Sequence, residues 1–106
     1  MNQEPLFVIV VPTYNRVELL IRSLKSIENQ EYKNWKCVVV NDGSTDDTDH
    51  KVLDYIQGKD NFSYIKQENQ GVNAARNAGI DLIQQSIVDC YYIFIGLLTH
   101  NSAFAI

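Results

Sequence analysis

The sequence of 106 residues lacks the features of a secreted, membrane-spanning or nucleic-acid-binding protein. It contains no apolar run near the ~20 residues that are needed to span a bilayer. No basic segment precedes the first apolar stretch, so no signal peptide is expected. Nine Lys and Arg against 13 Asp and Glu give a formal charge of −4 without a basic stripe, which argues against a nucleic-acid polymer as partner. We therefore expect a cytoplasmic protein.

Cysteine is also scarce. Cys37 and Cys90 each lie at the edge of an apolar segment and lack metal-ligand spacing, which favours two core-lining thiols over a disulfide or a zinc site. The hydrophobic fraction of 45% and the charged fraction of 21% are typical of a folded globular protein. The length predicts a single domain, residues 1–106, which is small for a complete enzyme that must hold two substrates.

Glycine is absent from the first predicted loop, VPTYNR (11–16). The dinucleotide fingerprint and the P-loop both need glycines so that backbone amides can approach phosphate oxygens, so both of those nucleotide folds are disfavoured. The loop instead offers the Tyr14 ring for stacking on a planar base, and the hydroxyls of Thr13 and Tyr14 for hydrogen bonding. The alternative is that Pro12 only ends a strand and Asn15 only caps a helix.

Apolar segments of strand length alternate with segments of helical periodicity along the chain. Continuous apolar runs predict strands at 6–11, 35–40, 62–66 and 90–95. Strands separated by helices at this spacing pair in parallel through right-handed crossovers, which predicts an α/β fold of three layers (α/β/α) with a mainly parallel, Rossmann-like sheet. Ligands of such open sheets bind beyond the carboxyl ends of the strands, so the loops at those ends form the candidate site.

The predicted helices carry recognisable start and stop signals. Asn15 with Glu18, and Ser44 with Asp47, fit the pattern in which one side chain caps the helix and an acid follows three residues later. Gly58 is the expected C-terminal stop of the second helix.

Four aspartates cluster at the end of the second strand, in CVVVNDGSTDDTD (37–49). Asp46, Asp47 and Asp49 are interpreted as acids at the start of a helix, where the macrodipole favours negative charge. Their spacing does not match a calcium-binding loop. Asp42 follows the strand directly and is the candidate functional acid, because an ionised carboxylate accepts hydrogen bonds from a base N–H or from ribose hydroxyls but repels phosphate.

The third predicted loop and helix form the block ENQGVNAARNAGI (68–80), with the helix expected at 71–86. Asn73, Arg76 and Asn77 share one helical face. That face is either solvated or, because the helix starts at the carboxyl edge of the sheet, brings Arg76 within reach of a diphosphate. A small apolar surface on this helix is formed by Ala75, Ala78, Gly79 and Leu82. The small residues in it would allow the helix to lie close to the sheet.

Three blocks, taken together, carry a family resemblance: VIVVPTYNR, VVVNDGSTDDT and ENQGVNAARNAGI. In this order and spacing they resemble the donor-binding half of glycosyltransferase family 2, whose members have the GT-A fold and use nucleotide-diphosphate sugars. The resemblance implies a nucleotide-sugar site formed by Pro12, Thr13, Tyr14, Asn15, Asp42, Gly43, Ser44, Asn73 and Arg76. It implies that Asp42 contacts the base and that Arg76 helps to place the nucleotide.

The resemblance further implies an inverting glycosyltransferase that moves a sugar, for instance from a UDP-sugar, to an acceptor hydroxyl of a saccharide or a lipid-linked molecule that the sequence does not identify. The family holds a divalent metal, Mg²⁺ or Mn²⁺, through a short acidic motif after the fourth strand. The corresponding positions here are Gly96, Leu97 and Leu98, and no Asp or Glu occurs from residue 90 to residue 106. A lone His100 is interpreted as a surface residue. The metal ligands and the catalytic residues are therefore not expected in this chain.

Residues 96–106 depart from the family pattern. A truncation, a frameshifted end and a naturally short protein each remain open as explanations. We expect the nucleotide-binding half of a longer enzyme, inactive alone, whose parent protein sits at the inner face of the membrane. The alternative is a non-catalytic nucleotide-binding or interaction module. An uncovered edge at the fourth strand would favour a homodimer, because unpaired backbone groups invite pairing.

Overall fold

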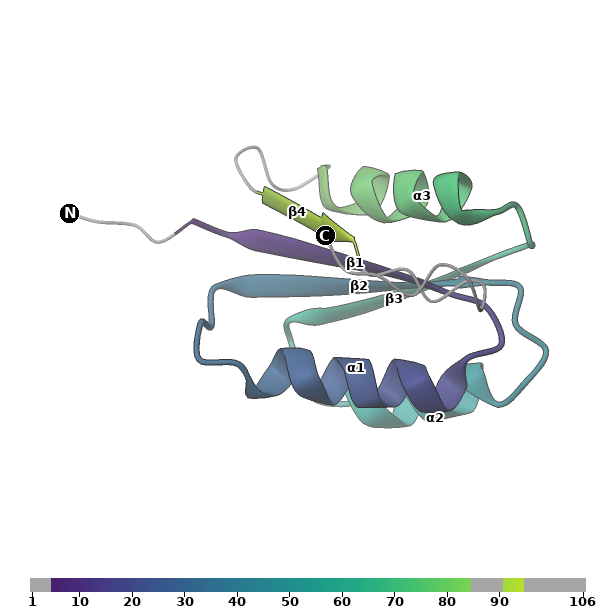
Figure 1. The fold of residues 1–106 in the computed structure, drawn as a ribbon, viewed down its shortest axis with the longest axis horizontal. Coiled ribbons are helices and arrows are strands. Elements are labelled where there is room, and N and C mark those ends of the chain that lie inside the picture. The colour runs from purple at the N-terminus through teal and green to yellow at the C-terminus, as the bar shows by residue number, and fades with distance from the viewer. Residues whose placement is uncertain (1–4, 85–90, 95–106) are drawn as a thin grey trace.

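The computed structural model describes residues 5–84 and 91–94. Strands and helices alternate along the chain in the order β1 (Phe7–Thr13), α1 (Val17–Asn29), β2 (Trp35–Asp42), α2 (Thr48–Ile56), β3 (Phe62–Gln67), α3 (Val72–Gln84) and β4 (Tyr91–Phe94). Helices α1 and α2 cover one face of the sheet, and α3 covers the other (Figure 1). The predicted three-layer α/β/α architecture is confirmed.

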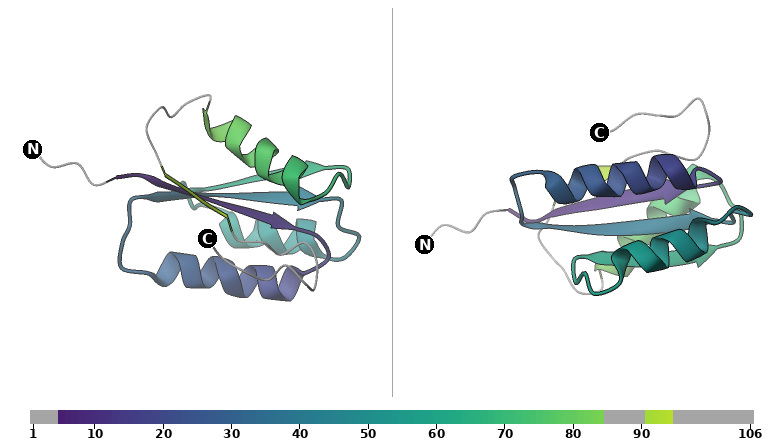
Figure 2. Two further views of the ribbon diagram at one scale, coloured as in Figure 1. Left: turned by 45° about the horizontal axis from the view of Figure 1, so that its top comes forward. Right: turned by 90° about the horizontal axis from the view of Figure 1, so that it is seen from below.

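The four described strands form one parallel sheet in the order β3-β2-β1-β4. In the central pair Thr13 lies opposite Asn41, and in the next pair Asp42 lies opposite Gln67. The carboxyl ends of β1, β2 and β3 therefore reach the same edge of the sheet, as the two views in Figure 2 show. The loops that follow these three strands are brought together at that edge.

The sheet is buried on both faces because helices cover each side, and successive residues of a strand point to opposite sides. On one side Val11 packs in a cluster with Leu24 of α1 and Val52 of α2. On the other side Val10 packs in a cluster with Ala75 of α3. All five of these side chains are completely buried. Burial on both faces explains why the strands read as continuous apolar runs rather than as alternating patterns.

Helix α3 lies very close to the centre of the sheet at Gly79. A Cβ atom at Gly79 would lie 2.6 Å from Cγ1 of Val10 and 3.4 Å from Cγ2 of Val40. The predicted small surface of this helix is confirmed at this glycine and at the buried Ala75. A larger side chain at either position would push α3 away from the face of the sheet.

The predicted helix caps are wrong. Helix α1 begins at Val17 with Arg16 as N-cap, and α2 begins at Thr48 with Asp47 as N-cap, so Asn15 and Ser44 are not the capping residues. Neither N-cap side chain makes a capping hydrogen bond. The two predicted caps instead make hydrogen bonds to each other's loop, which local sequence patterns do not reveal.

Two other predictions about element ends have opposite outcomes. Pro12 does not end the first strand, because β1 continues to Thr13. Gly58 does stop the second helix: α2 ends at Ile56, and Gly58 has a φ of +77° in the left-handed region that favours glycine.

The predicted core-lining thiol is confirmed at Cys37, which is buried between the sheet and the helices of the α1 side. Burial raises the pKa of this thiol well above its usual range. Cys90 lies outside the described residues. Among the described helices, none has the length and the apolar character that a membrane crossing requires.

Candidate functional site

Hydrogen bonds join the first loop, after β1, to the second loop, after β2. The N–H of Asn15 donates to Oγ of Ser44 at 2.9 Å. In return Oδ1 of Asn15 accepts from the N–H of Thr45 at 2.7 Å and from the N–H of Asp46 at 3.2 Å. Asn15 has a φ of +52°, a conformation that asparagine tolerates better than most residues. Asn15 therefore connects the two loops through both its backbone and its side chain.

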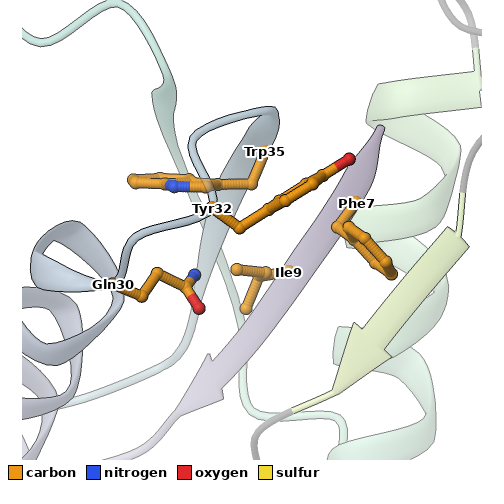
Figure 3. Close-up of a pocket in the computed structure, with 5 residues that line it drawn as sticks. All are labelled: Phe7, Ile9, Gln30, Tyr32 and Trp35. Carbon is orange, nitrogen blue, oxygen red and sulfur yellow. The ribbon is translucent and has the colours of Figure 1, made fainter. Parts of the chain in front are cut away.

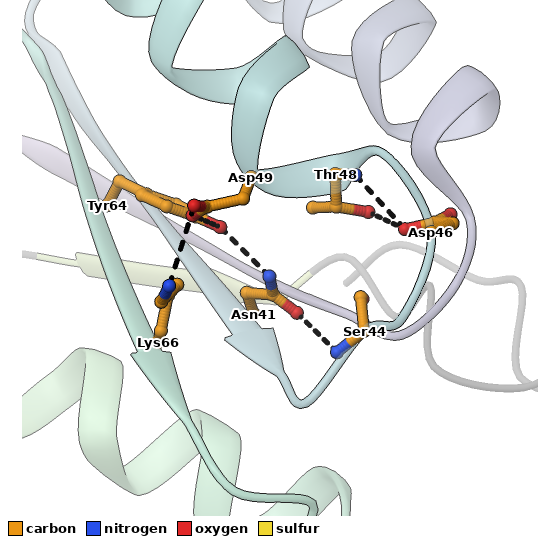
Figure 4. Close-up of polar contacts among 7 residues, drawn as sticks. All are labelled: Asn41, Ser44, Asp46, Thr48, Asp49, Tyr64 and Lys66. Carbon is orange, nitrogen blue, oxygen red and sulfur yellow. Dashed lines mark hydrogen bonds and ion pairs between the residues drawn. The ribbon is translucent and has the colours of Figure 1, made fainter.

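Asp46 connects the starts of two helices. Its Oδ2 accepts from the N–H of Val17 in α1 at 3.4 Å, and its Oδ1 accepts from the N–H of Thr48 in α2 at 3.1 Å. The Thr48 hydroxyl also donates to Oδ1 of Asp46 (Figure 4). The prediction that Asp46 is an acid at a helix start is confirmed and extended, because the same carboxylate satisfies an exposed amide at two helix N-termini.

The side chain of Asp42 connects the second loop to the third, which follows β3. Its Oδ1 accepts from Nε2 of Gln67 and from the N–H of Gln70, both at 2.9 Å. Its Oδ2 accepts from the N–H of Gly71 at 3.0 Å. Asp42 is only 1% exposed, so the third loop covers it. A carboxylate offers about four lone-pair positions, and these contacts occupy both positions of Oδ1 but only one of Oδ2.

Gly43 allows the second and third loops to touch. Its φ is +86°, and a Cβ atom there would lie 2.9 Å from the backbone N of Asn69. Contacts that short are essentially never made by a real Cβ atom, so any other residue would displace the third loop. The predicted site residues Asp42 and Gly43 are thus adjacent to the same stretch, residues 67–71.

A chain of polar side chains runs beneath the second loop and was not predicted from the sequence (Figure 4). The N–H of Ser44 donates to Oδ1 of Asn41, whose Nδ2 donates to the Tyr64 hydroxyl. Tyr64 in turn donates to Oδ1 of Asp49, and each of these bonds measures 2.9 Å. Lys66 lies 3.5 Å from the other oxygen of Asp49. The polar Asn41, at the end of an otherwise apolar strand, is the feature of the sequence that could have indicated these polar contacts.

The environment of Tyr64 disfavours its ionised form. Burial, followed by the contact with Asp49, raises the pKa of Tyr64 to about 12, although the hydrogen bond from Asn41 opposes the shift. Tyr64 therefore remains a neutral donor to Asp49 at physiological pH. The second loop is thus supported by a protonated phenol, not by a charge that would change near neutrality.

The remaining predicted site residues differ in their burial and in their position in the fold. Pro12 and Thr13 are buried in β1, with Thr13 fully inaccessible, whereas Tyr14 is half-buried against the cluster on the α3 side. Asn73 and Arg76 lie in the N-terminal half of α3, at the predicted edge. Their side chains lie outside what the structure describes.

The described residues do not fit a metal site. They contain no group of three or more His, Cys, Asp or Glu side chains that could hold a metal ion. The positions where an acidic motif was expected, Gly96, Leu97 and Leu98, and also His100, lie outside the described residues. No step of a reaction can therefore be assigned to a metal held by this part of the chain.

A shallow hollow of about 190 Å³ lies at the opposite end of the sheet, where β1 and β2 begin (Figure 3). It is lined by Phe7, Ile9, Gln30, Tyr32 and Trp35. The rings of Phe7 and Tyr32 meet edge to face, with centroids 5.3 Å apart. This hollow is apolar and lies at the amino ends of the strands, so it is separate from the candidate site.

A parallel α/β sheet whose carboxyl edge carries three interlinked polar loops defines an α/β domain with a candidate ligand site, since that edge is where such sheets bind ligands. The profile of the family "Glycosyl transferase family 2" matches residues 8–95. The chain belongs to this family. All three loops fall inside the matched region.

Curated proteins support the same family. The chain is 44% identical over 73 residues to glycosyltransferase GlyA of Streptococcus pneumoniae, covering 69% of this chain and 10% of that protein. It is 38% identical over 79 residues to a GalNAc(5)-diNAcBac-PP-undecaprenol β-1,3-glucosyltransferase of Campylobacter jejuni, covering 73% and 26%. It thus spans only about a tenth to a quarter of the length of these relatives.

Solved structures support the GT-A fold. A mannosyltransferase of Pyrobaculum calidifontis in complex with GDP-Man and Mn²⁺ superimposes with a TM-score of 0.76 at 23% identity, covering 89% of this chain and 28% of that one. TarS of Staphylococcus aureus superimposes with a TM-score of 0.62 at 26% identity, covering 87% and 26%.

Proposed function

We propose that this chain supplies the nucleotide-binding part of a family 2 glycosyltransferase that transfers a sugar from a nucleotide-diphosphate donor to an acceptor hydroxyl. The observation that carries the proposal is the meeting of three polar loops at one edge of the sheet, inside the region that matches the family. The relatives in S. pneumoniae and C. jejuni are named as glycosyltransferases, which supports the transfer reaction for the longer protein.

In this proposal the nucleoside lies between the first and third loops. The Tyr14 ring stacks on the base, and the free lone-pair position on Oδ2 of Asp42 accepts a base N–H. Because Asp42 is buried, we propose that the third loop must move away from Oδ2 before a base can reach it. Gly71, whose N–H covers that oxygen, has a φ of +98° and open space around it, which is compatible with such a movement.

The other predicted residues have supporting roles in the proposal. Asn73 and Arg76, in the N-terminal half of α3, are proposed to bind the diphosphate, for which a guanidinium is well suited. Gly43 and Ser44 form the wall of the pocket on the second loop. Pro12 and Thr13 are proposed to shape the first loop from within the sheet, and their burial supports this role.

The donor and the metal are inferred from the solved mannosyltransferase, which contains GDP-Man and Mn²⁺. It supports a nucleotide-sugar donor and a divalent metal, Mg²⁺ or Mn²⁺, for the complete reaction. Because the described residues do not form a metal site, we propose that nucleotide binding by this chain does not require the metal. A UDP-sugar remains our predicted donor.

The acceptor and the surroundings of the longer protein are also proposals. The name of the C. jejuni relative contains an undecaprenol-linked saccharide, which supports a lipid-linked acceptor. With such an acceptor, we propose a cytoplasmic enzyme at the inner face of the membrane. Among the described strands β4 lies at one edge of the sheet, and pairing of two copies there would give a homodimer. Light scattering that detects only monomer at high concentration would contradict the dimer.

A second candidate function is a non-catalytic nucleotide-binding or interaction module. It is favoured by the sequence from residue 90 to residue 106, which contains no Asp or Glu to replace the acidic motif of the family. Residues 96–106, which depart from the family pattern, would then belong to the single domain 1–106 without serving catalysis. Measurable sugar transfer by the pure chain would exclude this candidate.

Calorimetric titration with UDP and with GDP, with and without Mn²⁺, tests the proposal. We expect binding that Mn²⁺ does not alter and that Asp42→Asn weakens strongly, since the substitution removes the carboxylate acceptor. The matched control is Asp54→Asn, an exposed aspartate on the outer side of α2. Equal affinities of both variants and the wild type would contradict the role of Asp42. Binding that strictly requires Mn²⁺ would contradict the proposal that the nucleotide binds without a metal.

A further inference from the structure

Two side chains, Asn15 and Asp46, hold the first and second loops against each other. We call the contacts of Asn15 with Ser44, Thr45 and Asp46, and of Asp46 with Val17, the interloop clamp. Each bond of the clamp joins residues 29 to 31 positions apart in the sequence. The clamp therefore fixes the separation of two loops that the chain connects only through the whole of α1 and β2.

The chemistry of the clamp demands an unusual residue at position 15. The backbone needs a φ of +52°, which glycine, asparagine and aspartate adopt most readily. The side chain must also present an oxygen that accepts from the N–H groups of Thr45 and Asp46. Glycine meets the first demand only, and alanine meets neither. Oδ1 of Asn15, which also receives the Thr45 hydroxyl at 3.4 Å, has no lone pair left for a ligand.

We propose that Asn15 and Asp46 are positioning residues, which act on the nucleotide through the loops they hold. The inference rests on the proposed function, because Tyr14 lies on the first loop that the clamp joins and Asp42 directly precedes the second. Held loops lose less conformational freedom when a ligand binds, so the clamp raises affinity by pre-organisation. Asn15 and Asp46 are both exposed, as is Thr45. The clamp therefore governs local opening of the loops more than global unfolding.

Two substitutions at position 15 separate the acceptor from the backbone conformation. Asn15→Gly keeps the positive φ but removes the acceptor, and Asn15→Asp keeps both. Gly58→Ala is the control: it introduces a side chain at a φ of +77° into open space at the other end of α2, so it strains the backbone without touching the loops. A loss of affinity that simply followed a loss of stability would appear in Gly58→Ala as well.

Amide hydrogen exchange by NMR measures the clamp without any ligand. We expect Asn15→Gly to accelerate exchange at Thr45 and Asp46 about tenfold, the ratio that corresponds to about 1.4 kcal/mol, whereas Asn15→Asp restores protection. Asp46→Ala should accelerate exchange at Val17 in the same way. Unchanged exchange in Asn15→Gly would overturn the clamp.

Calorimetry with UDP then measures the positioning role. We expect Asn15→Gly to weaken binding about tenfold, Asn15→Asp to recover part of that loss despite its added charge, and Gly58→Ala to bind as the wild type does. Faster exchange with unchanged affinity would overturn the positioning role alone. A wild-type chain that binds neither UDP nor GDP would overturn the proposed function, and the positioning role with it, while the exchange result would still report on the clamp.

Discussion

Substitution of Asp42 provides the sharpest test of how the loops are held. Its carboxylate accepts three hydrogen bonds from the third loop: from Gln67, Gln70 and Gly71. Hydrogen bonds to a charged group contribute about 1.5–3 kcal/mol each, but the two backbone donors belong to exposed residues that water can satisfy when the loop opens. We therefore expect Asp42→Ala to lower the free energy of unfolding by about 2–4 kcal/mol.

Asp42→Asn should have a smaller effect because the amide oxygen can still serve Gln67 and Gln70. Its NH₂ group would then face the N–H of Gly71. A hydrogen bond would thus be replaced by two donors that face each other, which lowers the free energy of unfolding by about 1–3 kcal/mol. With a urea m-value of about 1–3 kcal/mol/M for a small domain, a loss of about 2 kcal/mol shifts the unfolding midpoint by roughly 1 M.

Urea unfolding followed by circular dichroism measures both variants, with Asp54→Asn as the control. Asp54 is exposed on α2, so its substitution should change the free energy of unfolding by no more than about 0.5 kcal/mol. Midpoints of Asp42→Ala and Asp42→Asn that equal the wild-type midpoint would refute the view that this buried carboxylate stabilises the third loop.

Two further predictions concern the core and the support of the second loop. Gly79→Ala places a Cβ atom 2.6 Å from Val10. The overpacking costs about 1–3 kcal/mol against a gain in helix propensity of about 1 kcal/mol, so thermal unfolding should show a lower Tm, and this loss should be smaller when Gly79→Ala is made in a Val10→Ala background. Tyr64 has a pKa raised to about 12 from 10, so its stabilising effect is present below pH 10 and is lost as the pH rises to 12; Tyr64→Phe should flatten this part of the stability profile. A steeper loss in Tyr64→Phe than in the wild type, or a Gly79→Ala variant as stable as the wild type, would contradict the respective prediction.

The order of the elements was predictable because it depends on local periodicity. The strands Phe7–Thr13 and Trp35–Asp42 are mostly buried on both faces, so each contains a continuous run of apolar residues. Such a run can be recognised in the sequence. The stop at Gly58 was predictable for the same reason, because a left-handed C-terminal residue is a local demand.

The meeting of three loops at one edge of the sheet was predictable from the sequence, but the contacts among these loops were not. Asn15 and Ser44 resemble N-caps because capping rules consider only the few residues that follow. Their actual partners lie about 30 positions away and become neighbours only after β1 and β2 pair in parallel. The role of Tyr64 was missed for the same reason, since nothing near it in the sequence shows that Asn41 and Asp49 flank its hydroxyl.

The two connections between loops differ in a way that bears on ligand binding. The first and second loops are joined by Asn15, a neutral and exposed side chain whose acceptor oxygen is fully used. The second and third loops are joined by Asp42, a buried carboxylate with an unused position on Oδ2. A base reaches the unused position on Oδ2 only when the third loop, with the N–H of Gly71, moves away, and it leaves the contacts of Asn15 intact. It follows that binding should rearrange the third loop while the first two stay fixed, so nucleotide should change amide exchange at Gln70 and Gly71 and preserve protection at Thr45.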